Sequence, residues 1–312
     1  MHFYLGVTDN DWFATLRNQQ ASECNFWMPS GRTFNVLQPG QEFLFKLKAP
    51  HNHIGGGGKF VRSQQLPLRL AWEVFGVANG CGDDSEFTRK ILGYRASATA
   101  SADRNPTITC VVLEGTVFFD QRDWIPVPSD WAGNIVTGKT HDPANPLHAQ
   151  LWQHYRLMRD RYRTMHHSIE MRQMVDAPAR YGAAYMVAPR VGQAAFRLQV
   201  LDAYDQRCAI TREHTPLVLE AAHIRPYAKQ GAHALANALL LRSDFHRLFD
   251  AGYVTVDSDY RIQVSPRIAA ETANGVRYRQ RAGQQIHLPT DQTHWPDRAL
   301  LAWHQHEVFL AG

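Results

Sequence analysis

The sequence has few cysteines and no long apolar run. Four cysteines lie far apart along 312 residues, at positions 24, 81, 110 and 208, and none forms a CxxC pair. This scarcity argues against a zinc ribbon and against a disulfide-stapled secreted module. No segment approaches the roughly 18 uninterrupted apolar residues of a membrane span, and the N-terminal stretch MHFYLGVTDNDWF is acidic where an export signal is basic. We therefore expect a cytoplasmic protein without membrane association.

The sequence also has little excess of charge of either sign, except in one stretch. The chain holds 33 basic and 29 acidic residues and is 44% hydrophobic, which indicates a globular protein with room for two domains. Residues 1–150 hold 13 basic and 14 acidic side chains, residues 151–200 hold 8 and 3, and residues 201–312 hold 12 and 12. The positive balance therefore lies in the middle of the chain, which favours an anionic partner there.

The first part of the chain has the pattern of a β-rich domain. Its short apolar runs, broken by Gly, Pro and Asn, are FYLGV, TFNVL, EFLFKLKA, KFV and TITCVVLEGTVFF. Helical spacing interrupts them at 11–17 and 66–75, which predicts small helices covering the ends of a curved sheet or barrel. The run Gly55–Gly58 lacks the context of a phosphate-binding loop. We expect a flexible loop or a tight strand entry there, with backbone approach to a nucleic acid as the alternative.

A polar, proline-containing segment, HDPANPLHAQ, marks a domain boundary near residue 141. The helix expected over 149–175 places one stripe of large side chains on a face, with most arginines off it. The stripe comprises Leu151, Tyr155, Met158, Tyr162 and Met165, and the arginines are Arg156, Arg159, Arg161 and Arg163. A DNA-backbone grip and an ordinary solvated basic face are both compatible with this pattern.

The stretch from Cys208 to Gly252 contains an ordered set of polar residues. An apolar strand ends in His223, Asn237 follows in a loop, and His246 lies on an expected helix beginning at Ser243. Together with AAHIRPY, NALLLRSDFHRLFDAG and RVGQAAFR, this order resembles the HNH endonucleases. That resemblance implies a ββα-metal fold that hydrolyses phosphodiester bonds. The rest of this segment predicts a helix over 194–204, hairpins at 208–224 and 253–264, and a C-terminal helix after Pro296.

The resemblance implies a role for each motif residue. His223 matches the general base, Asn237 the residue that orients the base through the backbone or the ring nitrogen, and His246 the metal ligand on the helix. The chain departs from the common pattern at Ala222, where many members have a ligand. Strand alternation places Glu220 on the face of Ala222, so we expect Glu220 as a second ligand. Asp244 and Asp250 are the other candidates.

Imidazole and carboxylate ligands favour a divalent metal, Mg²⁺ or Mn²⁺, with Co²⁺ or Ni²⁺ as substitutes. We expect no small-molecule cofactor. The other histidines of this part, at 166, 167, 214 and 233, are expected to be ordinary core or surface residues. His233 has the strongest claim to a role, because it lies between the expected base and the expected ligand. The alternative interpretation of the motif is an inactive HNH module that only binds DNA.

The N-terminal segments FYLGVTDNDWFATLR, NFWMPSGRTFNVLQPGQEFLFKLKAPHNHIGGGGKF and LPLRLAWEVFGVANG resemble the EVE-type domains of the PUA-like superfamily. Such domains hold a flipped, modified base in an aromatic pocket, and stacking contributes about 1–3 kcal/mol per base. The candidate aromatic residues are Trp12, Phe26, Trp27, Phe45 and Trp72, each of which is alternatively a core residue. The candidate hydrogen-bonding residues are Asn10, Asp11, Asn25 and Ser30.

The fold class that follows is α+β in three parts. An N-terminal PUA/EVE-like β-barrel with flanking helices spans 1–140, a basic helical linker spans 141–189, and a C-terminal ββα-metal HNH nuclease domain spans 190–312. Contacts to the DNA backbone are expected from the linker and from Arg190, Gln193, Arg197, Arg207 and Arg225.

The function that follows is a modification-dependent DNA endonuclease, of the type IV restriction kind, that reads a modified cytosine such as 5-methylcytosine in double-stranded DNA. A homodimer is expected because cutting both strands needs two active sites or two successive events. The alternatives are a nicking or repair nuclease that recognises damaged or backbone-modified DNA, and a noncatalytic reader of modified nucleic acid.

Overall fold

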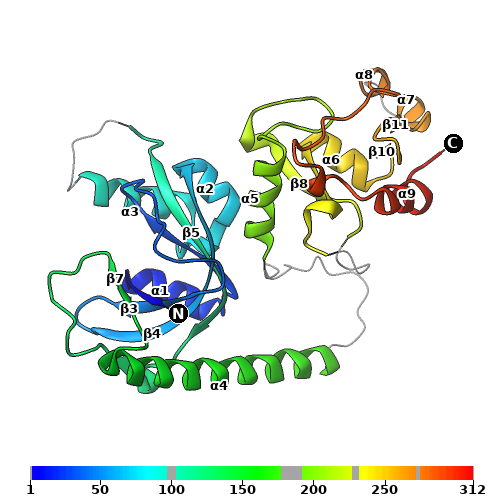
Figure 1. Ribbon diagram of the computed structural model, residues 1–312. Helices are drawn as coiled ribbons and strands as arrows, with labels where there is room; N and C mark the ends of the chain where they lie inside the picture. Colours follow the sequence, from blue (N-terminus) through cyan, green and yellow to red (C-terminus); the bar gives the residue numbers. More distant parts are fainter. Residues whose placement is uncertain (1, 97–102, 177–191, 227–231, 272–274, 312) are drawn as a thin grey trace. The chain divides into compact units, whose positions relative to one another are not determined.

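A computed structural model describes residues 2–96, 103–176, 192–226, 232–271 and 275–311, with only the backbone given for 166–176 (Figure 1). The chain divides into two compact units, 1–192 and 193–312. All four cysteines are buried and free.

The first unit is built on one mixed sheet. Its strands are β1 (Phe3–Thr8), β2 (Glu23–Met28), β3 (Glu42–Leu47), β4 (His53–Pro67), β5 (Thr107–Phe118), β6 (Ile125–Pro126) and β7 (Gly138–His141). The strand order is β2-β5-β4-β3-β1-β7, with β6 on β4, and only β1 and β3 pair in parallel. No pairing among the described residues joins β2 to β7, so the expected closed barrel is not shown.

The helices of this unit only partly follow the expected pattern. They are α1 (Asn10–Asn18), α2 (Leu68–Phe75), α3 (Asp84–Ala96) and α4 (Pro146–Asp176), with 3-10 turns η1 (Gly76–Asn79) and η2 (Gln121–Asp123). The helix predicted from Leu66 begins at Leu68, because β4 continues to Pro67. Helix α3 was not predicted, since it buries only Phe87 and Ile91 and shows little apolar periodicity. The predicted strand at TFNVL is irregular.

The glycine run at 55–58 lies inside β4, which is paired on both sides, so the expected loop is wrong. A Cβ on Gly56 would lie 2.1 Å from the carbonyl oxygen of Val117. A Cβ on Gly57 would lie 2.5 Å from the hydroxyl of Tyr155, which belongs to α4. Glycine is therefore needed because a strand on one side and a helix on the other approach the backbone closely.

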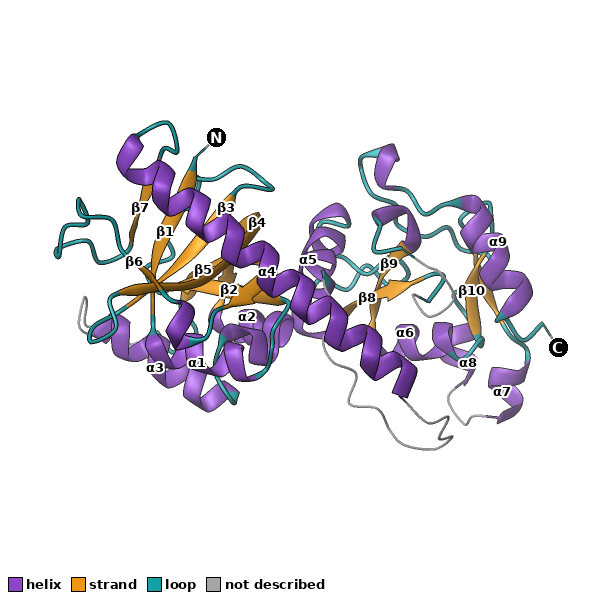
Figure 2. Ribbon diagram, turned by 90° about the horizontal axis from the view of Figure 1, so that it is seen from below, coloured by secondary structure: helices purple, strands orange, loops and turns teal. Residues whose placement is uncertain are grey.

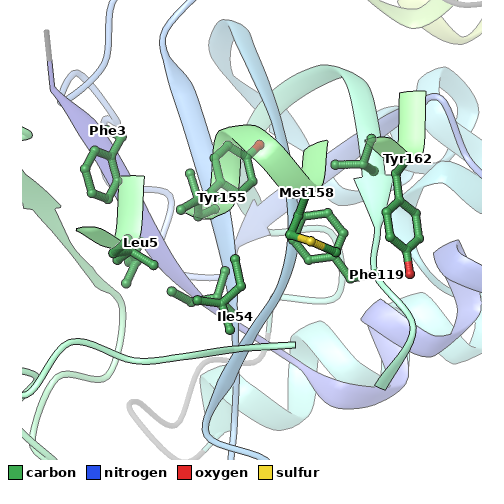
Figure 3. Close-up of a cluster of buried hydrophobic side chains, with 11 residues drawn as sticks. Phe3, Leu5, Ile54, Phe119, Tyr155, Met158 and Tyr162 are labelled. Carbon is green, nitrogen blue, oxygen red and sulfur yellow. The ribbon is translucent and has the colours of Figure 1, made fainter. Parts of the chain in front are cut away.

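Helix α4 crosses one face of this sheet (Figure 2). Four residues of its predicted stripe, Leu151, Tyr155, Met158 and Tyr162, are buried in a cluster with residues of β1, β3, β4 and β5 (Figure 3). Met165, the last residue of the predicted stripe, is 46% exposed, because the packed cluster ends at Tyr162. The first part of the expected linker thus packs within the first unit.

Alternation along β1 and β3 separates two buried faces of the sheet. Phe3, Leu5 and Leu44 lie in the cluster beneath α4. Their neighbours Tyr4, Phe43 and Phe45 point to the other face, where Phe45 contacts Trp12 and Phe13 of α1. A sheet covered on both faces explains why β3 is buried at every position.

The second unit contains two hairpins and five helices among the described residues. Its helices are α5 (Gln193–Ala203), α6 (Ser243–Asp250), α7 (Arg267–Glu271), α8 (Gly275–Arg279) and α9 (Arg298–Glu307). Its strands are β8 (Leu219–His223), β9 (Ala238–Arg242), β10 (Val254–Val256) and β11 (Ile262–Val264), and its 3-10 turns include η3 (Pro216–Val218), η5 (Leu235–Asn237) and η6 (Gln292–His294). The hairpin expected within 208–224 is wrong, because β8 pairs with β9.

Candidate functional site

The antiparallel pair β8 and β9, followed at once by α6, makes a ββα unit. His223 is the last residue of β8 and lies opposite Ala238, and Glu220 lies opposite Leu241. Ala222, Ala238, Leu239, Leu240 and Leu241 are fully buried, so the hairpin is anchored by apolar side chains. The polar residues at its ends are positioned by that core.

Asn237 organises the loop between the two strands. Its Oδ1 accepts from the backbone N–H of Arg225 at 2.9 Å, and its Nδ2 donates to the carbonyl oxygens of Arg225 and Ala232, each at 3.0 Å. Its own carbonyl accepts from the N–H of Ile224. Asn237 is 2% exposed. These three side-chain hydrogen bonds all join it to backbone groups, so it positions the strand end that carries His223.

The ring of His223 is held between two others. It stacks on Phe196 of α5, with 4.4 Å between ring centroids and 19° between planes. Its Nε2 lies 3.0 Å from Nδ1 of His233, so one imidazole donates and the other accepts. His233, for which the sequence favoured an ordinary surface or core role, therefore contacts the expected base directly.

His246 lies between two carboxylates. Its Nδ1 is 2.6 Å from Oε2 of Glu220, and its Nε2 is 3.4 Å from Oδ2 of Asp250, one turn later on α6. Burial, and secondarily Glu220, raises the pKa of the Asp250 carboxyl, and His246 opposes that shift. Two carboxylates facing one imidazole form a hard donor set that a divalent cation would neutralise.

The residues therefore fit a divalent metal, and the distances separate two roles. A histidine ligand commonly donates its other ring N–H to a carboxylate, and Glu220 at 2.6 Å has that relation to Nδ1. Two ligands about 2.1 Å from one ion lie roughly 3 Å apart, a separation close to that of His246 Nε2 and Asp250 Oδ2. In this geometry His246 and Asp250 could be the ligands, with Glu220 holding the ring of His246.

Asp244, another ligand candidate from the sequence, is engaged elsewhere. Arg242 contacts both of its carboxylate oxygens at 2.7 Å, and the hydroxyl of Tyr278 donates to Oδ2 at 3.3 Å. Burial raises the pKa of Asp244, but the hydrogen bonds and charge of Arg242 outweigh it and the net shift is downward. Asp244 thus anchors the start of α6.

The first unit contains a cavity of about 670 Å³ on the face of the sheet opposite α4. A volume of this size suits a small organic ligand. Its aromatic walls are Tyr4, Trp12, Phe26, Trp27 and Tyr94, and its polar or charged lining includes Asp9, Ser30, Arg32, Lys48, Arg95 and Thr137. The lining comes from positions 4 to 137, so the fold assembles it from distant segments.

Four of the predicted pocket residues line this cavity: Trp12, Phe26, Trp27 and Ser30. The indole N–H groups of Trp12 and Trp27 donate to the carbonyl oxygens of Asn25 and Asn79, at 3.1 and 2.9 Å. Trp12 is only 2% exposed and packs against Gly80. It therefore lines the cavity while most of its ring belongs to the hydrophobic core. Both rings are held rigidly by hydrogen bonds to the backbone.

The other predicted pocket residues lie outside the cavity lining. Asn10 bridges Lys48 N and Ala49 O, and the Asp11 side chain is 82% exposed beside Lys90. Asn25 is fully buried against Asn79. Trp72 packs on Phe87, and Phe45 belongs to the core. Each has a structural partner that the sequence does not reveal.

The acidic residue at the cavity is Asp9, which sequence reasoning missed. Its Oδ2 accepts from the Tyr94 hydroxyl at 2.7 Å, and Lys48 donates to that hydroxyl at 2.7 Å. Burial raises its pKa, but the hydrogen bonds of Tyr94 and Trp12, aided by Lys90 and Lys48, outweigh this, so its pKa is lowered and Asp9 stays ionised. An aspartate placed between a strand and a helix was the available signal, and it indicates only a helix cap.

The family model for HNH endonucleases matches residues 208–257. This range contains the ββα unit with His223, Asn237 and His246. Residues 208–257 form an HNH endonuclease domain. The match indicates a nuclease, and HNH nucleases generally use a divalent metal.

No curated protein matches the chain. Among solved structures, ASCH from Zymomonas mobilis is 8% identical, with a TM-score of 0.32, covering 48% of this chain and 94% of that one. The modification-dependent TagI restriction endonuclease is 14% identical, with a TM-score of 0.30, covering 87% of this chain and 64% of that one. At these scores neither likeness supports a conclusion about this chain, and the EVE resemblance stays a prediction.

Some of the residues predicted to contact the DNA backbone are exposed, and others already contact groups of the protein. Arg190 lies outside the described residues, while Gln193 and Arg207 are exposed near the HNH domain. Arg197 donates to the carbonyl of Leu219 at 3.3 Å, and Arg225 stacks over Trp303 at 5.3 Å. Arg197 and Arg225 thus have structural contacts that a phosphate would share or replace.

The arginines of α4 are likewise divided. Arg159 pairs with Glu42, which is 2% exposed, and Arg163 donates to the carbonyl oxygen of Gly115 at 2.9 Å. Arg161 is within 3.9 Å of Asp123, and Arg156 is exposed.

None of the described helices is long and apolar enough to span a membrane.

Proposed function

We propose that this chain is a modification-dependent DNA endonuclease. Its HNH domain hydrolyses the phosphodiester bond, and the cavity of its first unit holds a flipped, modified cytosine such as 5-methylcytosine. The observation that carries the proposal is the arrangement within 208–257: His223 fixed at a hairpin end, and His246 held between Glu220 and Asp250.

His223 is the general base of this proposal. Hydrolysis requires an acceptor for the proton of the attacking water, and a neutral imidazole fills that role near neutral pH. Asn237 secures the backbone around it, and Phe196 restrains the ring. The neighbouring His233 at 3.0 Å provides a second imidazole to which the proton can pass.

His246 and Asp250 hold the divalent metal, Mg²⁺ or Mn²⁺, and Glu220 orients the His246 ring. When bound, the metal supplies positive charge to the phosphate oxygens and the leaving oxygen. Without it, the carboxylates of Glu220 and Asp250 would repel the DNA backbone, so cleavage would depend on the metal.

Three features of the cavity support base recognition. Its aromatic walls offer stacking faces, which return about 1–3 kcal/mol per base against the cost of flipping. The ionised Asp9 carboxylate can accept a hydrogen bond from the exocyclic amine of cytosine. Val7, Met28 and Val136 add apolar surface suited to a methyl group. We propose double-stranded DNA as the partner and a homodimer as the unit that cuts both strands.

Digestion of matched plasmids tests the function. Unmethylated, 5-methylcytosine and 5-hydroxymethylcytosine plasmids are incubated with the full chain and Mg²⁺ or Mn²⁺, and nicked and linear products are quantified. We expect cleavage of modified DNA only, and none with a chelator. Equal cleavage of all three plasmids would overturn the reader role and leave the nuclease role intact. Binding of modified DNA without cleavage under any metal would overturn the nuclease role.

A further inference from the structure

A second group of metal-ligating side chains lies in the first unit, apart from the HNH domain. Asp130 belongs to the segment between β6 and β7, His141 ends β7, and His148 is in the first turn of α4. One donor atom from each, a carboxylate oxygen or a ring nitrogen, lies within 4.8 Å of the others. His148 Nε2 is 3.2 Å from Oδ2 of Asp130, and the two histidine rings lie edge to face at 4.4 Å.

The ring nitrogens of His141 are buried and available to a ligand. His141 is 1% exposed, and neither of its ring nitrogens has a hydrogen-bond partner among the described residues. The Nδ1 of His148, which is 6% exposed, also has none there. A neutral imidazole always has one donor and one acceptor nitrogen, and burying both unsatisfied is costly. A metal ion at the unprotonated nitrogen would remove part of that cost.

The surroundings prepare the ring for a cation. Phe3 and Trp131 lie nearly parallel to His141, at 5.5 and 6.2 Å between centroids, and restrain its plane. The Asp130 carboxylate accepts a hydrogen bond from Lys139 Nζ at 3.0 Å. Lys139 is 40% exposed and can turn into solvent when a metal takes its place.

We propose that Asp130, His141 and His148 bind a transition-metal ion, with Zn²⁺ as the favoured occupant. Two imidazoles and one carboxylate suit Zn²⁺ and, after it, Co²⁺ or Ni²⁺, with water as the fourth ligand. This ion is separate from the Mg²⁺ or Mn²⁺ of the HNH domain, which has a harder donor set.

The ion would link three segments of the first unit: the loop between β6 and β7, the end of β7 and the first turn of α4. One of them leads directly into the cavity, because Val136 and Thr137 lie between Asp130 and His141 and line it. Metal binding would therefore stabilise the rim of the cavity together with the start of α4. The benefit is conformational, since none of the three residues belongs to the HNH domain at 208–257.

Zn²⁺ and Co²⁺ binding to the full-length protein tests the proposal. The His246→Ala, Asp250→Asn variant serves as background, so that the HNH site does not contribute. We expect one equivalent of Zn²⁺ by calorimetry, visible absorption bands of tetrahedral Co²⁺, and a higher unfolding temperature with Zn²⁺. Asp130→Asn and His148→Gln should each weaken Zn²⁺ affinity at least about tenfold.

Two controls keep the result interpretable. His154→Gln changes an exposed histidine of the same helix and should leave Zn²⁺ affinity unchanged. Asp130 is partly exposed, so Asp130→Asn should fold even if changes at the buried histidines do not. No Zn²⁺ uptake by the background protein, or equal affinity in Asp130→Asn and His154→Gln, would overturn the site. Plasmid cleavage is measured separately, because loss of this ion does not remove the nuclease residues.

Discussion

The two candidate sites differ in how much of the chain builds each one. The HNH site draws its central residues from 220–250, a single hairpin and helix. The cavity collects residues from β1, α1, β2, α3 and the segment before β7, spread over positions 4 to 137. Both sites hold their side chains rigidly, the first by Asn237 and Phe196 and the second by hydrogen bonds from Trp12 and Trp27 to the backbone.

This difference determines how each site responds to mutation. In the proposed HNH mechanism each catalytic group has a role that no neighbour can take over, so the loss of one group should have a large effect on rate. In the cavity several aromatic faces share the binding of one ligand, so each change has a smaller effect on preference.

His223→Ala should produce the largest effect. Removing the general base lowers the cleavage rate by about 10²–10⁴-fold, whereas binding of modified DNA should stay within a few-fold of the unchanged protein. Single-turnover cleavage and a binding assay in Ca²⁺ measure the two properties. The exposed His214→Ala is the matched control. A His223→Ala protein that cuts normally would remove this residue from the mechanism.

Asp250→Asn and Glu220→Gln should separate the ligand from its support. Glutamine can still accept from His246 Nδ1, but asparagine loses the charged ligand oxygen. We expect Asp250→Asn to raise the Mn²⁺ concentration for half-maximal cleavage by about 10–100-fold, and Glu220→Gln to raise it less. Cleavage rates measured over a range of Mn²⁺ concentrations show which variant needs more metal. The reverse order would make Glu220 the ligand, as the sequence alone predicted.

Trp27→Leu should reduce the preference for modified DNA by about tenfold, within the roughly 1–3 kcal/mol that stacking on one aromatic ring contributes. Trp72→Leu is the matched control, because both tryptophans contact Phe87 but only Trp27 lines the cavity. Competition binding between methylated and unmethylated duplexes measures the preference. Equal losses in the two variants would mean that packing, not the cavity, is responsible.

The second unit should lose stability between pH 6.5 and 4. His304 is 2% exposed, pairs with Thr255 and the carbonyl oxygen of Phe249, and has its pKa lowered to about 4, chiefly by burial. The unfolded chain takes up the proton near pH 6.5, so the stability is fully present above that value and is lost as the pH falls toward 4.

Hydrogen exchange of α9 and β10 at pH 7 and pH 4.5 measures this loss. His304→Gln should be less stable at pH 7 and should show a smaller further loss at pH 4.5. His306→Gln, whose side chain is 86% exposed on the same helix, should behave as the unchanged protein. An identical pH response in all three proteins would contradict the role given to His304.

The smallest effect is expected on α4. Arg156 is exposed, whereas Arg163 donates to the carbonyl oxygen of Gly115. If Arg156 contacts a phosphate, Arg156→Gln should reduce the slope of log affinity against log salt by about one. Arg163→Gln should leave that slope unchanged. Titrations of DNA binding at several salt concentrations measure both, and equal slopes in all proteins would remove Arg156 from the DNA contacts.

Local patterns were the part of the fold that the sequence predicted well. The helices at α5, α6 and α9 and the strand ending in His223 follow from apolar spacing and turn residues. The partner of β8 was mispredicted, because hairpin pairing skips a loop that local spacing cannot measure. For the glycine run the sequence left a flexible loop and a tight strand entry open, since nothing nearby in the sequence reveals that Val117 and Tyr155 contact it.

The same limit applies to the sites. The order His223, Asn237, His246 and the words around it resembled the HNH endonucleases, and that resemblance implied a base, an orienting residue and a metal ligand. Alternation on β8 also placed Glu220 on the right face. Which carboxylate lies at which nitrogen of His246 was decided only by the packing of α6 on β8. The contact between His223 and His233 was likewise decided by the folding of the loop.

For the cavity, the sequence determined little beyond a supply of aromatic side chains. Only the tertiary structure shows that Asp9 and Trp27, and not Asp11 and Trp72, line the cavity. It also brings Asp130, His141 and His148 close together. The physical reason is that residue type and spacing determine which face of an element a side chain occupies. The distance between side chains on different elements depends on how those elements pack.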